Sequence, residues 1–509
     1  MITLPKPSNI QPLELKQTEK IEIPVKLMTI DDYIDHLNYL HNDDLPELQE
    51  SGLVVARKLS ATYSKVMLGS KYRFAEETGS GELLFHAPNE FKSLNKDMAI
   101  PYMDDNKRKS INVFELFEKS RKTPKFSSVE FNPAIIGDYG KTKNLFRGYP
   151  FDKGDGQSFQ LNESTTRDKL LAFAGLQYPK SVRFIEHIWD NVADNQQPLV
   201  MQLLAWVADI IQNPASNPST ALVLQGADKG TGKTVTADII GSLVGKAHSF
   251  KTSNSEQIIG KFNAHLSNKM VVIGEEMSWG GSRDVNNIIK DKITSPVHAV
   301  ELKGIDIIMM RKYYRLILVT NEEWAVNASS DERRFIVCSV APHQKQNDEY
   351  FSPFFKGDGL CRVMLKDVFQ LLANVDYSSV DLSCGVETQG IKNQKIESMT
   401  PIQQWWSQCL DDGCITKYDR GGSSVPHDFD MEPRAQKGFV HDCYMSWLDK
   451  YKPANSERIT NTTSFGMAFV KLARGDKKQL VTTDQKKDGK PAYTFSGLEQ
   501  LKKQFFSNY

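Results

Sequence analysis

The sequence has 509 residues, enough for roughly three domains of ~150 residues each, and its 40% hydrophobic and 25% charged residues are typical of globular proteins. Its 63 basic side chains balance 63 acidic ones, so a nucleic-acid partner would need positive charge that is concentrated locally. No run approaches ~18 apolar residues, which argues against a membrane span, and no secretory signal is evident. The six scattered cysteines lack a C-x-x-C pair, which argues against a zinc site. Together these features predict a cytoplasmic protein with reduced thiols.

Residues 1–155 are expected to form a small mixed α/β accessory domain. Residues 1–25 are rich in proline and lysine and are interpreted as a mobile lead-in. Short apolar stretches such as Leu53–Ala56 and Val113–Phe117 then alternate with polar turns, and Gly154-Asp-Gly156 marks a plausible linker.

Residues 156–215 are predicted to be a helical collar or linker. From Leu199 to Ile211 apolar residues recur at intervals of three and four, which is the spacing of one apolar helix face. Asn213-Pro214 should end this helix, because proline disfavours helical geometry in the residue before it.

Residues 216–345 are predicted to be an α/β domain with an open parallel sheet and crossover helices, an AAA+-like P-loop ATPase. Short apolar runs suited to buried parallel strands begin at Ala221, Met270 and Leu316, with helical stretches between them. A helix is expected from about Thr234 to Val244.

A glycine-rich loop, residues 226–234, joins the first of these strands to its helix. Such a turn points backbone N–H groups and the helix dipole at one anion, and predicts a phosphate site. Lys233 can reach the phosphates of a nucleotide, and the Thr234 hydroxyl can hold Mg²⁺. The usual pattern has four residues between the first glycine and Gly-Lys, but here there are five, so Gly226 is displaced by one. The predicted ATP-binding residues are Gly226, Lys229, Gly230, Thr231, Gly232, Lys233 and Thr234.

Polar side chains end the next two predicted strands. Glu275 and Glu276 could hold the Mg²⁺ shell and activate water, although acidic pairs at strand ends are common in solvated turns. Asn321 could bond a phosphate or the water, or it could simply form a turn. Arg333 and Arg334 could reach a neighbouring subunit's site, the alternative being a surface ion pair with a nearby acid.

Two basic features could contact DNA. A predicted hairpin over 297–310 carries Lys303 at its turn, as a pore-lining charge or an ordinary solvated lysine, and Lys292 precedes it. Residues 346–434 are predicted to be helical, and 435–509 to form a winged-helix-like domain of two helices, a strand, a basic turn and a strand. Nine basic and four acidic residues give 465–509 a net charge of +5, with Lys486 and Lys487 at the turn.

Together, the ordered loop, acidic pair, hairpin and asparagine-ended strand resemble a superfamily 3 helicase, and most closely the helicase part of phage and plasmid primase-helicases. Trp206 before the loop, the segment 275–281, Lys303-Gly304 and the segment 144–148 carry the same resemblance, which spans about 125–345. It implies a ring-forming, usually hexameric ATPase that translocates on single-stranded or forked DNA, in a bacterial host's cytoplasm if the chain is phage-encoded.

The resemblance further implies that Thr234 and Glu275 bind Mg²⁺, that Glu276 activates water, that Asn321 senses phosphate and that Arg333 or Arg334 acts in trans. Relatives often carry a primase, but Asp104-Asp105 has no supporting third acid, so a separate primase or polymerase partner is expected. A loader ATPase that does not unwind DNA, or a primase-helicase with a degenerate primase, remains an alternative.

Overall fold

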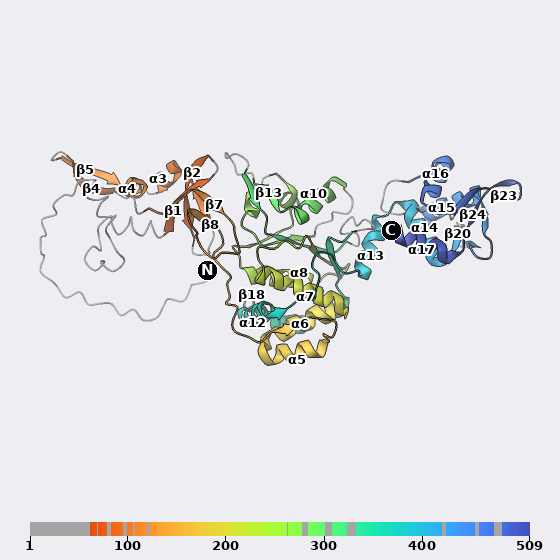
Figure 1. Ribbon diagram of the computed structural model, residues 1–509, viewed down its shortest axis with the longest axis horizontal. Helices are drawn as coiled ribbons and strands as arrows, with labels where there is room; N and C mark the ends of the chain where they lie inside the picture. The colour runs from red at the N-terminus through yellow and green to blue at the C-terminus, as the bar shows by residue number, and fades with distance from the viewer. Residues whose placement is uncertain are drawn as a thin grey trace. The chain divides into compact units, whose positions relative to one another are not determined.

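The computed structural model describes residues 62–68, 70–78, 83–94, 99–104, 107–119, 123–261, 263–276, 283–300, 308–322, 332–419, 424–452, 458–472 and 481–508 (Figure 1). The chain divides into two compact units. The first runs to Phe126, apart from residues 67–71 and 78–82, and the second contains those two short pieces and everything from Ser127 onward. The predicted lead-in and the apolar stretch at Leu53 lie outside the described residues.

The first unit is mixed α/β, as the sequence predicted. A four-stranded sheet has the order β3-β2-β1-β6, and β4 pairs with β5 in a separate antiparallel hairpin. Its core is aromatic: the rings of Phe74 and Phe91 stack at 4.6 Å, and Phe114 and Phe117 from α4 pack beside them. The elements are β1 (Tyr63–Leu68), β2 (Lys71–Glu77), β3 (Leu83–His86), α3 (Pro88–Leu94), β4 (Ala99–Asp104), β5 (Lys107–Asn112), α4 (Val113–Lys119) and β6 (Lys125–Phe126).

Residues 127–155, which the sequence assigned to the N-terminal domain, lie with the second unit instead. Strand β7 (Ser128–Glu130) pairs in parallel with β8 (Thr142–Asn144), and the segment after them packs on the second unit's core. The ring of Phe146 lies 5.1 Å from that of His248, and the Tyr149 hydroxyl donates to the Ile210 carbonyl at 2.8 Å. The predicted domain boundary at 155 rested on the glycine-rich composition of 154–156. Local composition carries no information about these long-range contacts.

A five-stranded, all-parallel sheet with the order β11-β12-β15-β10-β16 is the core of the second unit. The predicted runs form β10 (Ala221–Gln225), β12 (Val271–Glu275) and β15 (Arg315–Thr320), and the flanking β11 (Ser249–Thr252) and β16 (Phe335–Ser339) were not predicted. Because β15 lies between β10 and β12, the loop after β10 and the acidic end of β12 both lie next to the end of β15. The carboxyl ends of these strands meet at one edge of the sheet.

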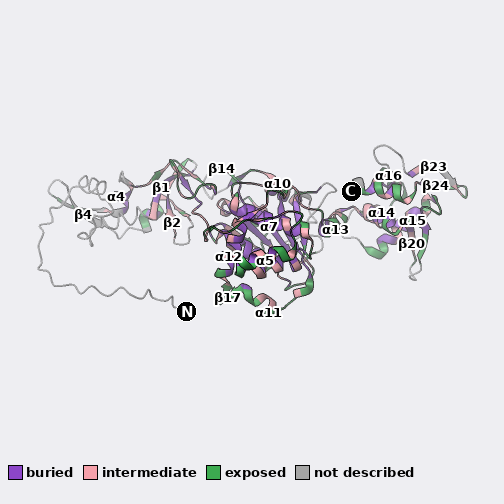
Figure 2. Cartoon of the chain, turned by 60° about the horizontal axis from the view of Figure 1, so that its bottom comes forward, coloured by how far each residue is buried: buried purple, intermediate pink, exposed green. Residues whose placement is uncertain are grey.

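Helices cover both faces of this sheet, so β10 and β15 are buried along their whole length and β12 and β16 are buried except at their last residue, and the interior of this part of the chain is purple in Figure 2. The edge strand β11 is only partly buried. On one face, Val223, Leu318 and Val337 share a core with Ile289 of α10 (Arg283–Thr294) and Ile391 of α13 (Gln389–Ser398). On the other face α8 packs against β12, and α7 and α12 pack against each other. The helices on that face are α7 (Gln197–Gln212), α8 (Lys233–Val244) and α12 (Arg362–Ala373).

Shorter elements complete this part of the second unit, and their bounds are as follows. Before α7 come β9 (Phe159–Gln160), α5 (Arg167–Gln177), η1 (Pro179–Ser181), α6 (Val182–Glu186) and the π-helical turn η2 (His187–Val192). Around the sheet are α9 (Glu256–Ile259), η3 (Ala264–Leu266), β13 (Val297–Val300), β14 (Ile308–Arg311), η4 (Pro342–Gln344), α11 (Asp348–Phe351), η5 (Ser352–Phe354), β17 (Phe355–Lys356), β18 (Gly359–Leu360) and β19 (Val375–Asp376).

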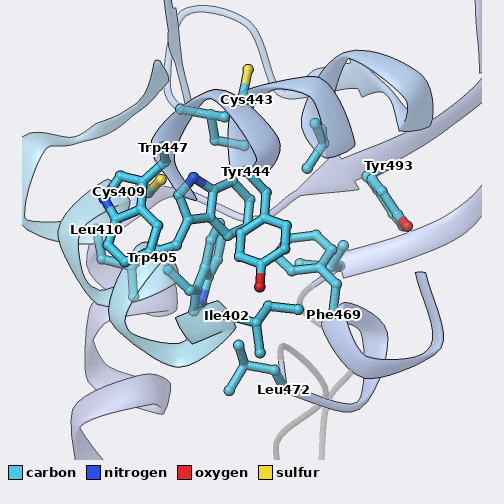
Figure 3. Close-up of a cluster of buried hydrophobic side chains, with 14 of the residues drawn as sticks. Ile402, Trp405, Cys409, Leu410, Cys443, Tyr444, Trp447, Phe469, Leu472 and Tyr493 are labelled. Carbon is cyan, nitrogen blue, oxygen red and sulfur yellow. The ribbon is translucent and has the colours of Figure 1, made fainter. Parts of the chain in front are cut away.

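The C-terminal residues have an aromatic core of their own (Figure 3). Trp405 lies 5.5 Å from Tyr444 and 5.6 Å from Phe469 between ring centres. Two helices, α15 and α16, are followed by β23, a turn and β24, and the three strands have the order β22-β24-β23. The winged-helix-like character of this part stays a prediction. The elements are α14 (Pro401–Asp412), β20 (Cys414–Tyr418), β21 (Ser424–Asp428), β22 (Arg434–Gln436), α15 (Lys437–Tyr451), α16 (Thr462–Leu472), β23 (Val481–Lys487), β24 (Lys490–Phe495) and α17 (Leu498–Asn508).

Candidate functional site

A pocket of about 490 Å³ lies at the carboxyl edge of the parallel sheet. It gathers residues from three strands and from one helix start, far apart in the sequence. Most of the residues predicted to bind nucleotide line it. The lining residues are Lys229, Gly230, Thr231, Gly232, Lys233, Thr234, Val235, Ser253, Glu275, Glu276, Val319, Thr320 and Asn321.

The glycine-rich loop takes a shape that its glycines permit. Gly230 and Gly232 have φ of 74° and 93°, a left-handed region that residues with a Cβ rarely adopt. At Gly232 a Cβ would also lie 2.5 Å from the His187 ring and 2.8 Å from that of Phe351. The positive φ and the close approach of these two rings therefore both require glycine immediately before α8.

Lys233, the first residue of α8, turns back over the loop. Its ammonium donates to the carbonyls of Gly226 at 2.7 Å and Asp228 at 2.6 Å. Burial lowers the pKa of Lys233, and the charge of Asp228 opposes that effect. The cation is thereby centred in the loop, on a residue that itself lines the pocket.

Gly226 does not line this pocket. It borders a different hollow of about 320 Å³ with Ala227, Glu322 and Ser339. Its contribution to the loop is the carbonyl that accepts from Lys233. The residue displaced in the sequence pattern is therefore separated from the pocket in space, whereas Lys229 to Thr234 lie along it.

The acidic pair lies at the end of β12, facing the pocket. Glu275 forms a 3.2 Å ion pair with Lys251, which also holds Asp238 at 2.8 Å. Burial disfavours the charged form of Lys251, but the hydrogen bonds and charges of Asp238 and Glu275 outweigh it and raise its pKa. Glu276 has a φ of 52°, an uncommon conformation for a residue with a Cβ. The strand therefore ends in a sharp turn that presents two adjacent carboxylates.

Asn321 follows the last residue of β15 and lines the same pocket. Because β15 separates β10 from β12, this amide lies next to both the glycine-rich loop and the acidic pair. The three predicted parts of the site, which are separated by dozens of residues in the sequence, are thus brought together by strand order alone.

Arg333 and Arg334 are outside this pocket. Arg334 bonds the buried Glu332 through both its guanidinium and its backbone N–H, each at 3.1 Å. Glu332 is also held by Lys290 of α10 at 2.6 Å. Arg333 is exposed, and its backbone carbonyl accepts from the Gly385 N–H at 2.7 Å. The ion pair with a nearby acid that was considered from sequence is therefore present for Arg334, although that acid is buried, while Arg333 is exposed on a backbone held by Gly385.

Of the four predicted DNA contacts, Lys292 and Lys487 have side chains among the described residues. The hairpin is confirmed as β13 and β14, but Lys303 at its turn lies outside the described residues. Lys292 is half-buried at the end of α10, and burial lowers its pKa. Lys487 pairs with Glu432 at 2.8 Å, and the side chain of Lys486 lies outside the described residues.

Sequence reasoning missed several contributors. Ser253 reaches the pocket because it follows β11, a short and partly polar edge strand. Lys251 on that strand holds Glu275. Asn191 of η2 donates to the Thr231 carbonyl of the glycine-rich loop, and His187 of η2 bonds Thr236 of α8 and lies against Gly232. A conventional apolar pattern marks none of these residues, since their importance arises from contacts that are distant in sequence.

The donor set suits a magnesium–nucleotide. Positive-φ glycines, a lysine and the start of a helix favour a phosphate, and the Thr234 hydroxyl with the two carboxylates supplies the oxygen ligands that Mg²⁺ prefers. The carboxylates and the lysine line one pocket, where a phosphate bridged by a cation would meet charges of both signs. ATP and Mg²⁺ therefore fit the residues present.

Comparison with known proteins places the fold. A family of unknown function, DUF5906, matches residues 224–334, and no curated protein matches the chain. An apo structure of the NrS-1 C-terminal region is similar, with a TM-score of 0.52 and 16% identity over 88% of this chain and 99% of that one. Its A-form apo structure has a TM-score of 0.54 and 17% identity, over 88% and 100%. The chain therefore shares the fold of this region.

Within the part of the chain that the structure describes, no helix is both long enough and apolar enough to cross a membrane.

Proposed function

We propose that this chain is an ATP-dependent DNA helicase of the superfamily 3 type, a ring-forming motor that acts on single-stranded or forked DNA in phage or plasmid-type replication. The observation that carries the proposal is the single pocket in which the glycine-rich loop, Glu275-Glu276 and Asn321 meet. The resemblance of the sequence to the helicase part of phage and plasmid primase-helicases supports a replication-related function, and the chain shares its fold with the NrS-1 C-terminal region.

The residues of the pocket divide the chemistry between them. Lys233 and the N–H groups of the loop would hold the phosphates, and Thr234 and Glu275 would hold Mg²⁺. When bound, Mg²⁺ neutralises the charge on the phosphate oxygens. Glu276 would orient and deprotonate a water, and Asn321, between loop and acid, would report whether the terminal phosphate is present.

Coupling to DNA is proposed through the hairpin of β13 and β14. This hairpin directly follows α10, and Lys290 of that helix bonds Glu332 beside the two arginines. A rigid helix therefore connects the candidate DNA element to the candidate inter-subunit arginines. Lys303 and Lys292 on the hairpin side, and Lys486 and Lys487 in the C-terminal domain, are the proposed phosphate contacts.

The central test measures the ATPase rate with and without single-stranded DNA, together with the mass of the ATP-bound assembly and strand separation on a forked duplex. We expect stimulation by DNA, a ring and unwinding. Stimulated hydrolysis without strand separation would instead identify a loader ATPase. An absence of ATP binding would overturn the proposal as a whole.

Two substitutions make this test specific. Lys233→Ala should abolish ATP binding because the loop loses its only buried cation among the described pocket residues. Glu276→Gln should bind ATP but hydrolyse it at least roughly a hundredfold more slowly, the usual worth of a general base. Lys246→Ala, an exposed lysine beyond the far end of α8, is the matched control and should leave both properties unchanged.

A further inference from the structure

Three successive carbonyls of the glycine-rich loop are held by hydrogen bonds from other segments or from α8. The Gly230 carbonyl accepts from the Gln346 N–H at 2.9 Å. The Thr231 carbonyl accepts from the Asn191 side-chain amide at 2.6 Å, and the Gly232 carbonyl accepts from the Thr236 hydroxyl at 3.0 Å. Gln346 lies just after η4 and Asn191 lies on η2, so the loop is braced from two sides.

Fixing a carbonyl also fixes the next N–H. In a trans peptide the C=O and N–H of one planar unit point in opposite directions. Restraining the carbonyls of Gly230, Thr231 and Gly232 therefore sets the directions of the N–H groups of Thr231, Gly232 and Lys233. Those residues line the pocket, so the braced loop presents consecutive donors to an anion there.

His187 connects this brace to Tyr350 through a directional chain. With the Thr236 hydroxyl donating to the Gly232 carbonyl, His187 Nε2, 3.0 Å from that oxygen, is the donor to it. His187 Nδ1 is then an acceptor, and the Tyr350 hydroxyl lies 3.2 Å from it. Burial lowers the pKa of His187 to about 4, so the imidazole is neutral near pH 7, as the chain requires.

The side-chain amide of Asn191 can hold the loop in only one orientation. It is 1% exposed, and its amide nitrogen, not its oxygen, must face the Thr231 carbonyl. Its own side-chain oxygen has no hydrogen-bond partner among the described residues, which is an unfavourable arrangement for a buried acceptor. It sits on a π-helical turn, a rare conformation that is often found at functional sites.

We infer that Asn191 and His187 are positioning residues, which act from behind the glycine-rich loop to hold its N–H groups ready for the phosphates of the nucleotide. This inference rests on the proposed ATP site and adds to it a second set of residues, on η2, that contact no phosphate themselves. Asn191 acts on Thr231 directly, and His187 acts on Gly232 through Thr236.

The test titrates the full chain with Mg·ATP and, separately, with inorganic tripolyphosphate, and records the melting temperature of each variant. Asn191→Leu and Thr236→Val each remove one donor, and each should weaken both ligands about tenfold because a loop carbonyl is released. Thr236→Ser keeps the hydroxyl and should restore affinity. Equal losses for the two ligands are expected, because the brace acts on the phosphate site and not on a base.

Asn144→Leu is the matched control. Its amide donates to the carbonyls of Asn132 and Ile135 in a turn away from the pocket. It should lower the melting temperature as Asn191→Leu does but leave both affinities within about twofold of wild type. If Asn191→Leu and Thr236→Val bind both ligands as tightly as the control, the positioning role is wrong. If wild type binds neither ligand, the proposed ATP site itself fails.

Discussion

Asp209 and Arg315 place two opposite charges inside the second unit, where they tie the end of α7 to the start of β15. Their side chains are 8% and 3% exposed, and Arg315 also donates to the Trp206 carbonyl at 2.9 Å and to Ser216 at 2.8 Å. Burial alone would raise the pKa of Asp209, but Arg315 and the Ser216 and Tyr377 hydroxyls outweigh it and lower that pKa. The pair therefore holds an ionised carboxylate in the core.

Removing the Arg315 guanidinium should show how much the buried ion pair contributes to stability. Arg315→Leu leaves Asp209 buried without its counter-ion, which should reduce the free energy of unfolding by about 3–5 kcal/mol at pH 7. In the wild type the stabilising effect of the low pKa is present above the unfolded value near ~3.9 and is lost as pH falls through the folded value. In the variant the loss of Arg315 should raise the pKa of Asp209, so the deficit in stability should shrink as pH falls from 7 toward about 5.

Denaturant unfolding at the two pH values measures this difference. Arg167→Leu is the control, because Arg167 makes a comparable two-bond pair with Asp190, at 2.6 and 2.5 Å, that is more than a third exposed. It should change stability by less than about 1 kcal/mol. A deficit of Arg315→Leu that stays the same or grows on acidification would contradict the assignment.

At the scale of elements, a buried lysine between β14 and β15, Lys312, binds the C-terminal end of α10. The Lys312 ammonium donates to the carbonyls of Lys292 at 2.6 Å and Ile293 at 2.7 Å, in the last turn of the helix. Burial lowers the pKa of Lys312 to about 7; Asp291 opposes this effect, and Arg315 and Lys292 add to it. The base of the hairpin is thus joined to α10 by a group that changes charge near neutral pH.

This pKa predicts a pH dependence of stability. The unfolded lysine keeps its proton up to about pH 10.4, whereas the folded one loses it near 7, so the unfolded chain binds more protons in between. Stability from this group should therefore rise as pH increases from about 7 to about 10. The Lys312→Met variant lacks this group, so its free energy of unfolding should not show the rise. Urea unfolding at several pH values should therefore show the stability of the wild type increasing relative to that of Lys312→Met as pH rises. Lys356→Met, at an exposed lysine of β17, should follow the wild type; a Lys312→Met curve parallel to wild type would count against the low pKa.

Much of the central sheet is predictable because its strands are continuous apolar runs. The helix α7, the strands β10, β12 and β15, and the hairpin of β13 and β14 follow directly from spacing and composition. β11 was missed because Ser249–Thr252 is short and half-buried at an edge, without an apolar run. That miss removed Ser253 and Lys251 from the expected site. The contacts of His187 and Asn191 could not be anticipated, since a buried polar residue in a helical segment carries no periodic signal.

At the scale of the whole molecule, the two arginines differ in what they can offer another subunit. Arg334 is held by Glu332, whereas Arg333 is exposed on a backbone fixed by Gly385. Gly385 approaches so closely that a Cβ would lie 2.2 Å from the Phe335 carbonyl. Arg333 is therefore the better candidate to reach a neighbour's phosphates.

Subunit mixing tests this assignment. Arg333→Ala should keep ATP binding but lose hydrolysis by roughly 10³-fold or more, the usual worth of an arginine supplied in trans. Mixed with inactive Lys233→Ala chains it should recover part of the activity, because one chain supplies the intact loop and the other the arginine. Arg334→Ala should chiefly lower thermal stability. Full activity of Arg333→Ala at dilutions where only monomers exist would rule out the trans role.

The contact between His187 and Gly232 also limits how this protein can evolve. A larger residue at 232 meets two independent obstacles, the ring of His187 with that of Phe351 and the φ of 93°. Shrinking His187 would relieve part of the first and none of the second, while breaking the chain through Thr236. No single compensating substitution can therefore make a side chain acceptable at 232, and the loop and η2 are expected to change only together, through several coupled substitutions.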